Sequence, residues 1–163
     1  MAQRVFTQPF CVAGAIIEKN GKILLVKESG EKRADAGKWN QPGGWIDVGE
    51  DPLVAVKREV AEETGYEFTP THIVGIYSLV RDDLTQIYGG DTPHAIKIIY
   101  TGTLSDKPVR ELESDVSSVE GFTQDQIEKM GAALRDVDII QEVKDYYAGQ
   151  RFPLDIINHT IQK

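Results

Sequence analysis

Residues 44–66 read GWIDVGEDPLVAVKREVAEETGY. Within this stretch Glu59, Glu62 and Glu63 are spaced so that they share one face of an α-helix. Like charges placed in this way cost an isolated helix about 0.2–0.5 kcal/mol per pair. No cation stands between these acids in the sequence, so we interpret them as oxygen ligands of a bound divalent metal.

The sequence also marks where this helix begins and ends. Asp51 is a favourable N-cap, and Pro52 suits the first helical position, where its missing N–H costs nothing. Gly65 can take the left-handed conformation that ends many helices. The predicted buried stripe of the helix consists of Leu53, Val56 and Val60.

The whole stretch resembles the signature of the Nudix hydrolases. In that signature a glycine, five residues and a glutamate are followed, after seven more residues, by Arg-Glu-aliphatic-x-Glu-Glu-x-Gly-aliphatic. The matching positions are Gly44, Glu50, Arg58, Glu59, Val60, Glu62, Glu63 and Gly65. Tyr66 holds the final aliphatic position and can still bury a large ring. The resemblance implies an α/β fold, an α/β/α sandwich with a mixed β-sheet between helices.

The same resemblance implies a Mg²⁺-dependent pyrophosphohydrolase, in which Mn²⁺ can substitute and a metal-activated water cleaves a phosphoanhydride bond. Glu59, Glu62 and Glu63 would be the metal ligands, and one of them or a later acid would be the general base. We interpret Arg58 as a clamp that orients Glu50 or a ligand carboxylate. The predicted catalytic residues are therefore Glu59, Glu62 and Arg58.

Family members usually recruit a further carboxylate from a loop after the last central strand. Four acids fall in this stretch of the chain, and Asp115 is the predicted ligand among Glu111, Glu113, Asp115 and Glu120. Gly43 is also predicted at the metal site, because its backbone and that of Gly44 can approach a phosphate closely. A plain turn is the alternative interpretation of the two glycines.

Candidate substrate contacts are aromatic or basic side chains and one glycine. Aromatic rings can stack on a base, although in a domain of this size they more often belong to the core. Basic side chains can bind phosphate, although solvated surface charge is the commoner role; this applies also to Lys27 and Lys97. The predicted substrate-binding residues are Trp39, Gly44, Trp45, Arg33, Lys38 and Tyr88.

Composition narrows the remaining possibilities. A chain of 163 residues fits a single domain, which we predict to span residues 1–163. Eighteen basic and 26 acidic residues give a net charge of −8, which argues against non-specific nucleic-acid binding. The chain has no apolar run of membrane-spanning length, and we predict a cytoplasmic protein without a membrane partner. Cys11 has apolar neighbours and is predicted to be a buried thiol.

Elsewhere the sequence predicts a hairpin at Asn20-Gly21 and later strands and helices. The predicted strands are Ile73–Val80, Ala95–Leu104 and Ser117–Phe122. The predicted helices run from Thr123 to about Met130 and from Val137 to Tyr147, and the buried stripe of the second helix is expected to be Ile140, Val143 and Tyr147.

The leading hypothesis for the substrate is a nucleoside di- or triphosphate, because residues 39–44 resemble the entry to the motif in phosphatases of such compounds. The alternatives are ADP-ribose, dinucleoside polyphosphates, thiamine-type diphosphates, or a non-catalytic module that only binds a nucleotide. An intact set of motif carboxylates favours an enzyme. The sequence leaves open the preferred substrate, the bond cut, the number of metals, the general base and whether the protein is a homodimer.

Overall fold

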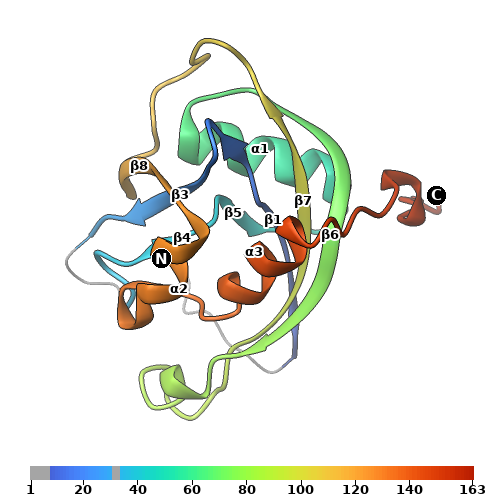
Figure 1. Cartoon of the computed structure of the whole chain (residues 1–163). Coiled ribbons are helices and arrows are strands. Elements are labelled where there is room, and N and C mark those ends of the chain that lie inside the picture. The colour runs from blue at the N-terminus through green and yellow to red at the C-terminus, as the bar shows by residue number, and fades with distance from the viewer. Residues whose placement is uncertain (1–7, 31–33) are drawn as a thin grey trace.

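A mixed four-stranded sheet lies at the centre of the computed structural model, which describes residues 8–30 and 34–163 (Figure 1). The strand order is β5-β1-β7-β6. β1 pairs in parallel with β7, whereas the β1–β5 and β6–β7 pairs are antiparallel. These strands are β1 (Phe10–Ala15), β5 (Gly43–Trp45), β6 (Phe68–Val80) and β7 (His94–Leu104).

A second, antiparallel sheet is built on β3, which pairs with β2, β4 and β8. Its strands are β2 (Glu18–Lys19), β3 (Lys22–Glu28), β4 (Trp39–Asn40) and β8 (Val116–Phe122). Asn20 and Gly21 join β2 to β3 with φ angles of 54° and 74°. Both values are positive, as a tight two-residue hairpin requires, so the predicted hairpin is confirmed.

Helices cover both faces of the mixed sheet, which confirms the predicted α/β/α sandwich. The α-helices are α1 (Pro52–Thr64), α2 (Gln124–Lys129) and α3 (Ile139–Tyr147), and the 3₁₀ turns are η1 (Asp82–Leu84), η2 (Gly131–Ala133) and η3 (Leu154–Ile156). In the part of the chain that is described, no helix is long and apolar enough to cross a membrane.

Two apolar cores result from the alternation of side chains along β1. Ala13 and Ala15 pack with Val56 and Val60 of α1 on one face. On the other face Ile16, directly after β1, belongs to a separate cluster that includes residues of α2 and α3. Burial of a Val or Ile side chain contributes about 1.5–3 kcal/mol, so each face fixes its helix against the sheet.

The boundaries of α1 agree with the sequence prediction. The Asp51 side chain accepts a hydrogen bond of 2.9 Å from the Leu53 N–H, and Pro52 is the first helical residue. Gly65 has a φ of 80°, and its N–H donates to the Ala61 carbonyl. Val56 and Val60 are fully buried, so the helix is anchored along the predicted stripe.

Two predictions about burial are wrong. In the predicted stripe of α3, Val143 is buried and Ile140 is partly buried against the core, but Tyr147 is 39% exposed. Ile139 and Glu142 are buried in addition, because the helix turns a neighbouring face to the sheet. A buried acid on an apolar stripe is not expected from hydrophobic periodicity. Cys11 is exposed, because it lies near the start of β1, where the flanking chain is also exposed.

β1 and β5 approach so closely that glycine is required at Gly43. A Cβ atom there would lie 2.5 Å from the Cα of Gly14 and 2.6 Å from the carbonyl oxygen of Ala13. We expect Gly43→Ala to lower the free energy of unfolding by about 3 kcal/mol, since backbone atoms cannot move aside cheaply.

Urea denaturation checks this prediction, with Gly37→Ala as the control. Gly37 also has a positive φ, of 75°, but no atom of the described residues lies within 4 Å of the point that its Cβ would occupy. The control should therefore lose only about 1 kcal/mol. Equal losses in the two variants would contradict the packing argument.

Candidate active site

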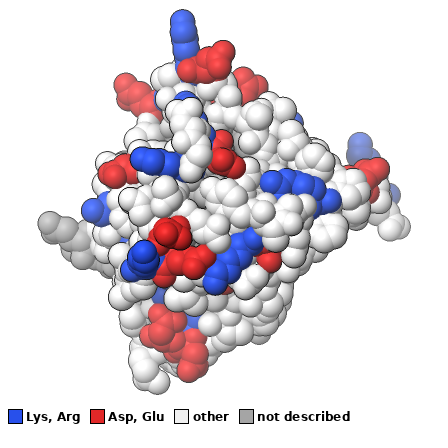
Figure 2. All heavy atoms as spheres, viewed as in Figure 1, with Lys and Arg blue, Asp and Glu red and all other residues white. Residues whose placement is uncertain are grey.

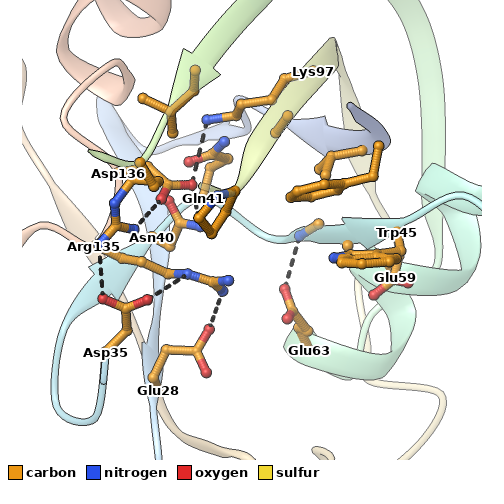
Figure 3. A pocket seen from close by; sticks show the side chains of 18 of the residues that line it. Glu28, Asp35, Asn40, Gln41, Trp45, Glu59, Glu63, Lys97, Arg135 and Asp136 are labelled. Atoms are coloured by element: carbon orange, nitrogen blue, oxygen red, sulfur yellow. Dashed lines mark hydrogen bonds and ion pairs between the residues drawn. The ribbon is translucent and has the colours of Figure 1, made fainter. Parts of the chain in front are cut away.

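A pocket of about 350 Å³ is bordered by both sheets and by α1 (Figure 3). It lies where the glycine-rich strand β5 passes the carboxylate-bearing face of the helix. Seven of the residues predicted from sequence line it: Gly43, Gly44, Trp45, Glu59, Glu63, Tyr88 and Asp115. The pocket therefore brings together predicted residues that lie as much as 72 positions apart in the chain, from Gly43 to Asp115.

The other predicted residues have different surroundings. Trp39 packs edge-on against Phe122, with ring centroids 4.8 Å apart, and is not among the pocket-lining residues. Lys38 forms an ion pair of 3.3 Å with Asp35. Arg33 lies outside the described residues. Substrate contact by these three side chains stays a prediction.

Arg58 holds the motif together from beside the pocket. Its Nε and Nη2 atoms each donate a hydrogen bond of 2.9 Å to the two carboxylate oxygens of Glu50. Nη2 also donates to the Trp45 carbonyl at 3.1 Å, which ties the helix to the end of β5. This is the bidentate geometry expected of a clamp. The Arg58 hydrogen bonds lower the pKa of Glu50, and Glu50 in turn raises the pKa of Arg58.

The same guanidinium is a cationic partner for the acidic face of α1. Arg58 Nη1 lies 2.6 Å from a carboxylate oxygen of Glu59 and 3.3 Å from one of Glu62. Arg110 adds a second ion pair to Glu62 at 3.6 Å. The interpretation that the acids have no basic partner is therefore wrong. Glu62 is neutralised away from the pocket, and Glu59 and Glu63 are the acids of α1 that line it.

Glu59 and Glu63 are packed against the glycines of β5. A Cβ atom at Gly44 would collide with the Glu59 carboxylate, which explains the glycine at this position. The Gly43 N–H donates a 2.8 Å hydrogen bond to Glu63. Burial, supported by repulsion from Glu59 and Glu28, raises the pKa of Glu63 to about 8. Burial also raises the pKa of Glu59, against the opposing effect of Arg58.

These residues fit a divalent cation by the chemistry of their donors. Two desolvated carboxylates with raised pKa values gain stability from a nearby positive charge, and hard oxygen donors suit Mg²⁺ or Mn²⁺. Within residues 8–30 and 34–163, no three acidic, histidine or cysteine side chains form a preassembled metal centre. The roles of Gly43 and Asp115 as ligands stay predictions.

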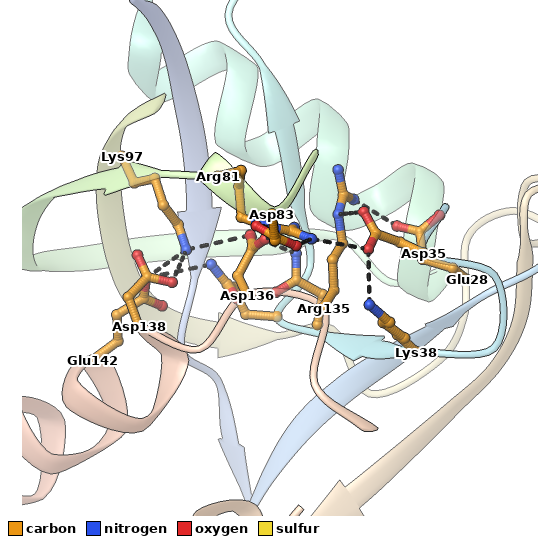
Figure 4. A network of polar contacts seen from close by, with 12 residues as sticks. Glu28, Asp35, Lys38, Arg81, Asp83, Lys97, Arg135, Asp136, Asp138 and Glu142 are labelled. Atoms are coloured by element: carbon orange, nitrogen blue, oxygen red, sulfur yellow. Dashed lines mark hydrogen bonds and ion pairs between the residues drawn. The ribbon is translucent and has the colours of Figure 1, made fainter. Parts of the chain in front are cut away.

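The sequence did not predict most of the pocket wall formed by Lys97, Arg135 and Asp136 (Figure 4). Lys97 was expected on the surface but is only 1% exposed, and it forms ion pairs with Glu142 at 2.7 Å and Asp138 at 2.9 Å. Its place in β7 between Ala95 and Ile99, which are buried, was the available signal. Arg135 and Asp136 gave no signal, because their partners Glu28, Asn40 and Lys97 come from strands far away in the sequence.

Acidic and basic side chains are intermingled on the molecular face in Figure 2. Single Lys and Arg side chains stand beside Asp and Glu, and no broad basic area covers this face. This distribution agrees with the net charge of −8 in giving no support to non-specific nucleic-acid binding.

Comparison with known proteins agrees with this geometry. The family model described as "NUDIX domain" matches residues 8–143. The chain belongs to the Nudix hydrolase family. Among curated relatives, "Phosphatase NudJ" of Shigella boydii is 26% identical over 151 residues, which cover 92% of this chain and 91% of the relative. The corresponding protein of Escherichia coli K12 is 25% identical over the same shares of the two chains.

Among solved structures, a Nudix hydrolase from Nitrosomonas europaea is 34% identical and superposes with a TM-score of 0.81. The match covers 94% of this chain and 98% of the other. A structure titled "UDP-X diphosphatase" has a TM-score of 0.66 at 22% identity and covers 93% and 69% of the two chains, so it supports the fold alone. The protein is thus an enzyme of the Nudix hydrolase class.

The clamp of this Nudix hydrolase can be tested at Arg58. We expect Arg58→Lys to lower the free energy of unfolding by about 1–2 kcal/mol, because an ammonium cannot keep two parallel bonds to Glu50. Chemical denaturation of Arg58→Lys, Glu50→Gln and the double variant measures the coupling. Strictly additive losses in the free energy of unfolding would show that the paired hydrogen bonds between Arg58 and Glu50 contribute nothing to stability.

Proposed function

We propose that this Nudix hydrolase is a Mg²⁺- or Mn²⁺-dependent pyrophosphohydrolase of nucleoside di- and triphosphates. The observation that carries the proposal is the pair of desolvated carboxylates, Glu59 and Glu63, in a pocket that also contains the rings of Trp45 and Tyr88. Carboxylates with raised pKa values can bind a cation that in turn binds the phosphate groups of such a substrate. Aromatic rings can stack on its base.

Glu59 and Glu63 would hold the metal, with Asp115, which also lines the pocket, as a further ligand. Glu62, the fourth predicted carboxylate ligand, would join them only by leaving its ion pairs with Arg58 and Arg110. When bound, the metal supplies charge neutralisation at the phosphoryl oxygens and lowers the pKa of a bound water. Arg58 fixes Glu50 and keeps the Glu59 carboxylate turned toward β5. The hydrogen bond from the Gly43 N–H favours the charged form of Glu63 and holds its carboxylate at the pocket wall.

Apolar side chains in the pocket are available for the organic part of the substrate. Phe10 and Trp45 are stacked with ring centroids 4.3 Å apart, and Leu79, Leu84 and Tyr88 also line the pocket. Stacking of a base on an aromatic ring contributes about 1–3 kcal/mol. A ring of this kind would not be required for inorganic pyrophosphate alone.

The relatives support a phosphate-releasing activity without fixing the substrate. NudJ is named a phosphatase, and one structural neighbour of 20% identity, the Nudix domain of Shewanella oneidensis NrtR, was solved in complex with ADP ribose. ADP-ribose, dinucleoside polyphosphates and thiamine-type diphosphates are therefore the alternative substrates. A module that binds a nucleotide without cleaving it is less well supported, because all the motif carboxylates are present.

A substrate panel tests the proposal directly. Nucleoside di- and triphosphates, ADP-ribose, a dinucleoside polyphosphate and thiamine diphosphate should be incubated with Mg²⁺, with Mn²⁺ and with chelator. We expect nucleoside di- or triphosphates to be cleaved fastest and every reaction to stop with chelator. Product analysis then locates the scissile bond. Nucleotide that is retained intact in the presence of metal would instead indicate a binding module.

Substitution of the pocket carboxylates gives a second test. We expect Glu63→Gln and Glu59→Gln each to lower kcat/KM at least about 100-fold, since an amide is a weaker metal ligand and cannot accept a proton. Glu62→Gln should cost less, because Glu62 faces Arg58 and Arg110. Glu67→Gln, at an exposed position just after α1, is the matched control. Comparable losses in the control and the pocket variants would contradict the assignment.

The remaining parts of the proposal concern the setting of the enzyme. We propose that residues 1–163 act as one domain in the cytoplasm, on a small-molecule substrate. A homodimer and a monomer are both compatible with this activity, and sedimentation of the purified chain distinguishes them.

A further inference from the structure

The pocket is lined by more acids than bases. Among the described residues, seven acidic side chains and three basic ones border it. A polyphosphate therefore meets a strongly negative surface, and the metal is one source of compensation. The three basic residues, Arg81, Lys97 and Arg135, are the protein's own candidates for the other source.

Two of these cations, Lys97 and Arg81, already have carboxylates around them. Lys97 is 1% exposed, and its ammonium lies within 3.6 Å of three carboxylates, those of Asp136, Asp138 and Glu142. Arg81 uses each of its three guanidinium nitrogens for a carboxylate, with Asp83, Asp35 and Asp136 as partners. Every side-chain nitrogen of these two cations therefore already has a carboxylate partner.

Arg135 differs from both. Its side chain is 34% exposed. Nη1 lies 2.7 Å from Glu28 and Nε lies 3.4 Å from Asp35, whereas Nη2 has no hydrogen-bond or ion-pair partner among the described residues. Arg135 is thus held by one hydrogen bond, from Nη1 to Glu28, and by the nearby Asp35 charge, and Nη2 is open.

The guanidinium of Arg135 lies near the acids of α1. Figure 3 shows the Arg135 guanidinium beside Glu28, on the side of the pocket that faces Glu63. The positive charge of Arg135 lowers the pKa of Glu63 and so offsets part of the larger raising effect of burial. An anion between α1 and Arg135 would therefore have carboxylates and their metal on one side and a guanidinium on the other.

We propose that Arg135 binds a phosphate group of the substrate through Nη2, with Glu28 and Asp35 as the residues that position it. This inference rests on the proposed function, because it assigns a contact within the same pocket. A guanidinium suits the task, since Nη2 carries two N–H donors for phosphate oxygens and the group keeps its charge at every physiological pH. The contacts with Glu28 and Asp35 restrain the side chain before substrate arrives, which reduces the entropic cost of binding.

The experiment compares Arg135→Met, Arg135→Lys and the control Arg151→Met. Arg151 is an exposed arginine that stacks on Tyr146, outside the pocket. Inorganic pyrophosphate is the binding probe in calorimetry, with Mg²⁺ present, and the best nucleotide of the substrate panel is used for kinetics. We expect Arg135→Met to weaken pyrophosphate binding and to raise KM at least about 10-fold, with kcat within about threefold. Arg135→Lys should recover part of this loss, and the control should behave as wild type.

The variant Asp35→Asn distinguishes a specific effect on Arg135 from a general loss of structure. It should raise KM a few-fold in the wild-type background and raise it less in Arg135→Met, because the part of its effect that acts through Arg135 is then absent, whereas its pairs with Arg81 and Lys38 remain affected. Thermal melts confirm folding of each variant, and if Arg135→Met fails to fold, Arg135→Lys and Asp35→Asn carry the comparison.

Each outcome separates the two claims. Wild-type binding of pyrophosphate by Arg135→Met, or an equal loss in Arg151→Met, overturns the role of Arg135 while the proposed function stands. A wild-type enzyme that binds pyrophosphate through Arg135 but cleaves no nucleotide leaves the contact in place and refutes the proposed function. Absence of pyrophosphate binding by the wild type refutes the contact.

Discussion

The hydrogen bonds of Arg58 are the interaction on which the rest of the site depends. One guanidinium joins Glu50 in the loop, the Trp45 carbonyl at the end of β5, and Glu59 on α1. Three segments of the motif are thereby held in one arrangement, and the carboxylates stay close to the glycine backbone. Without such a cation, repulsion among the acids would oppose the folding of α1, because like charges on one helix face destabilise it.

The structure also shows how a hydrolase can keep an acid-lined pocket stable. Glu59 and Glu63 lie against β5 with raised pKa values, and the opposite wall distributes its acids around Arg81, Lys97 and Arg135. The buried cations Lys97 and Arg81 therefore have carboxylate partners, which avoids the several kcal/mol that an unpaired charge would cost. The excess of acid over base that remains suits a site where a cation and a polyanionic substrate arrive together.

The sequence predicted α1 and its caps, the hairpin at Asn20-Gly21 and the pocket residues of the motif, because all of these depend on local chemistry. It did not predict the wall formed by Lys97 and Arg135. Their place in the pocket wall depends on ion pairs with residues such as Glu142 and Asp35, which are 45 and 100 positions away in the sequence. The prediction for Cys11 failed for a related reason, since apolar neighbours do not tell where a strand emerges from the core.

The central claim is that the carboxylates of Glu59 and Glu63 hold a divalent cation in this pocket. Isothermal titration calorimetry with Mn²⁺, with and without a nucleotide, tests it most directly on wild type and on the double variant Glu59→Gln/Glu63→Gln. The account predicts saturable uptake by the wild type and loss of that uptake in the variant, with both proteins folded by circular dichroism. Equal uptake by the two proteins, or no uptake by the wild type in either condition, would contradict it.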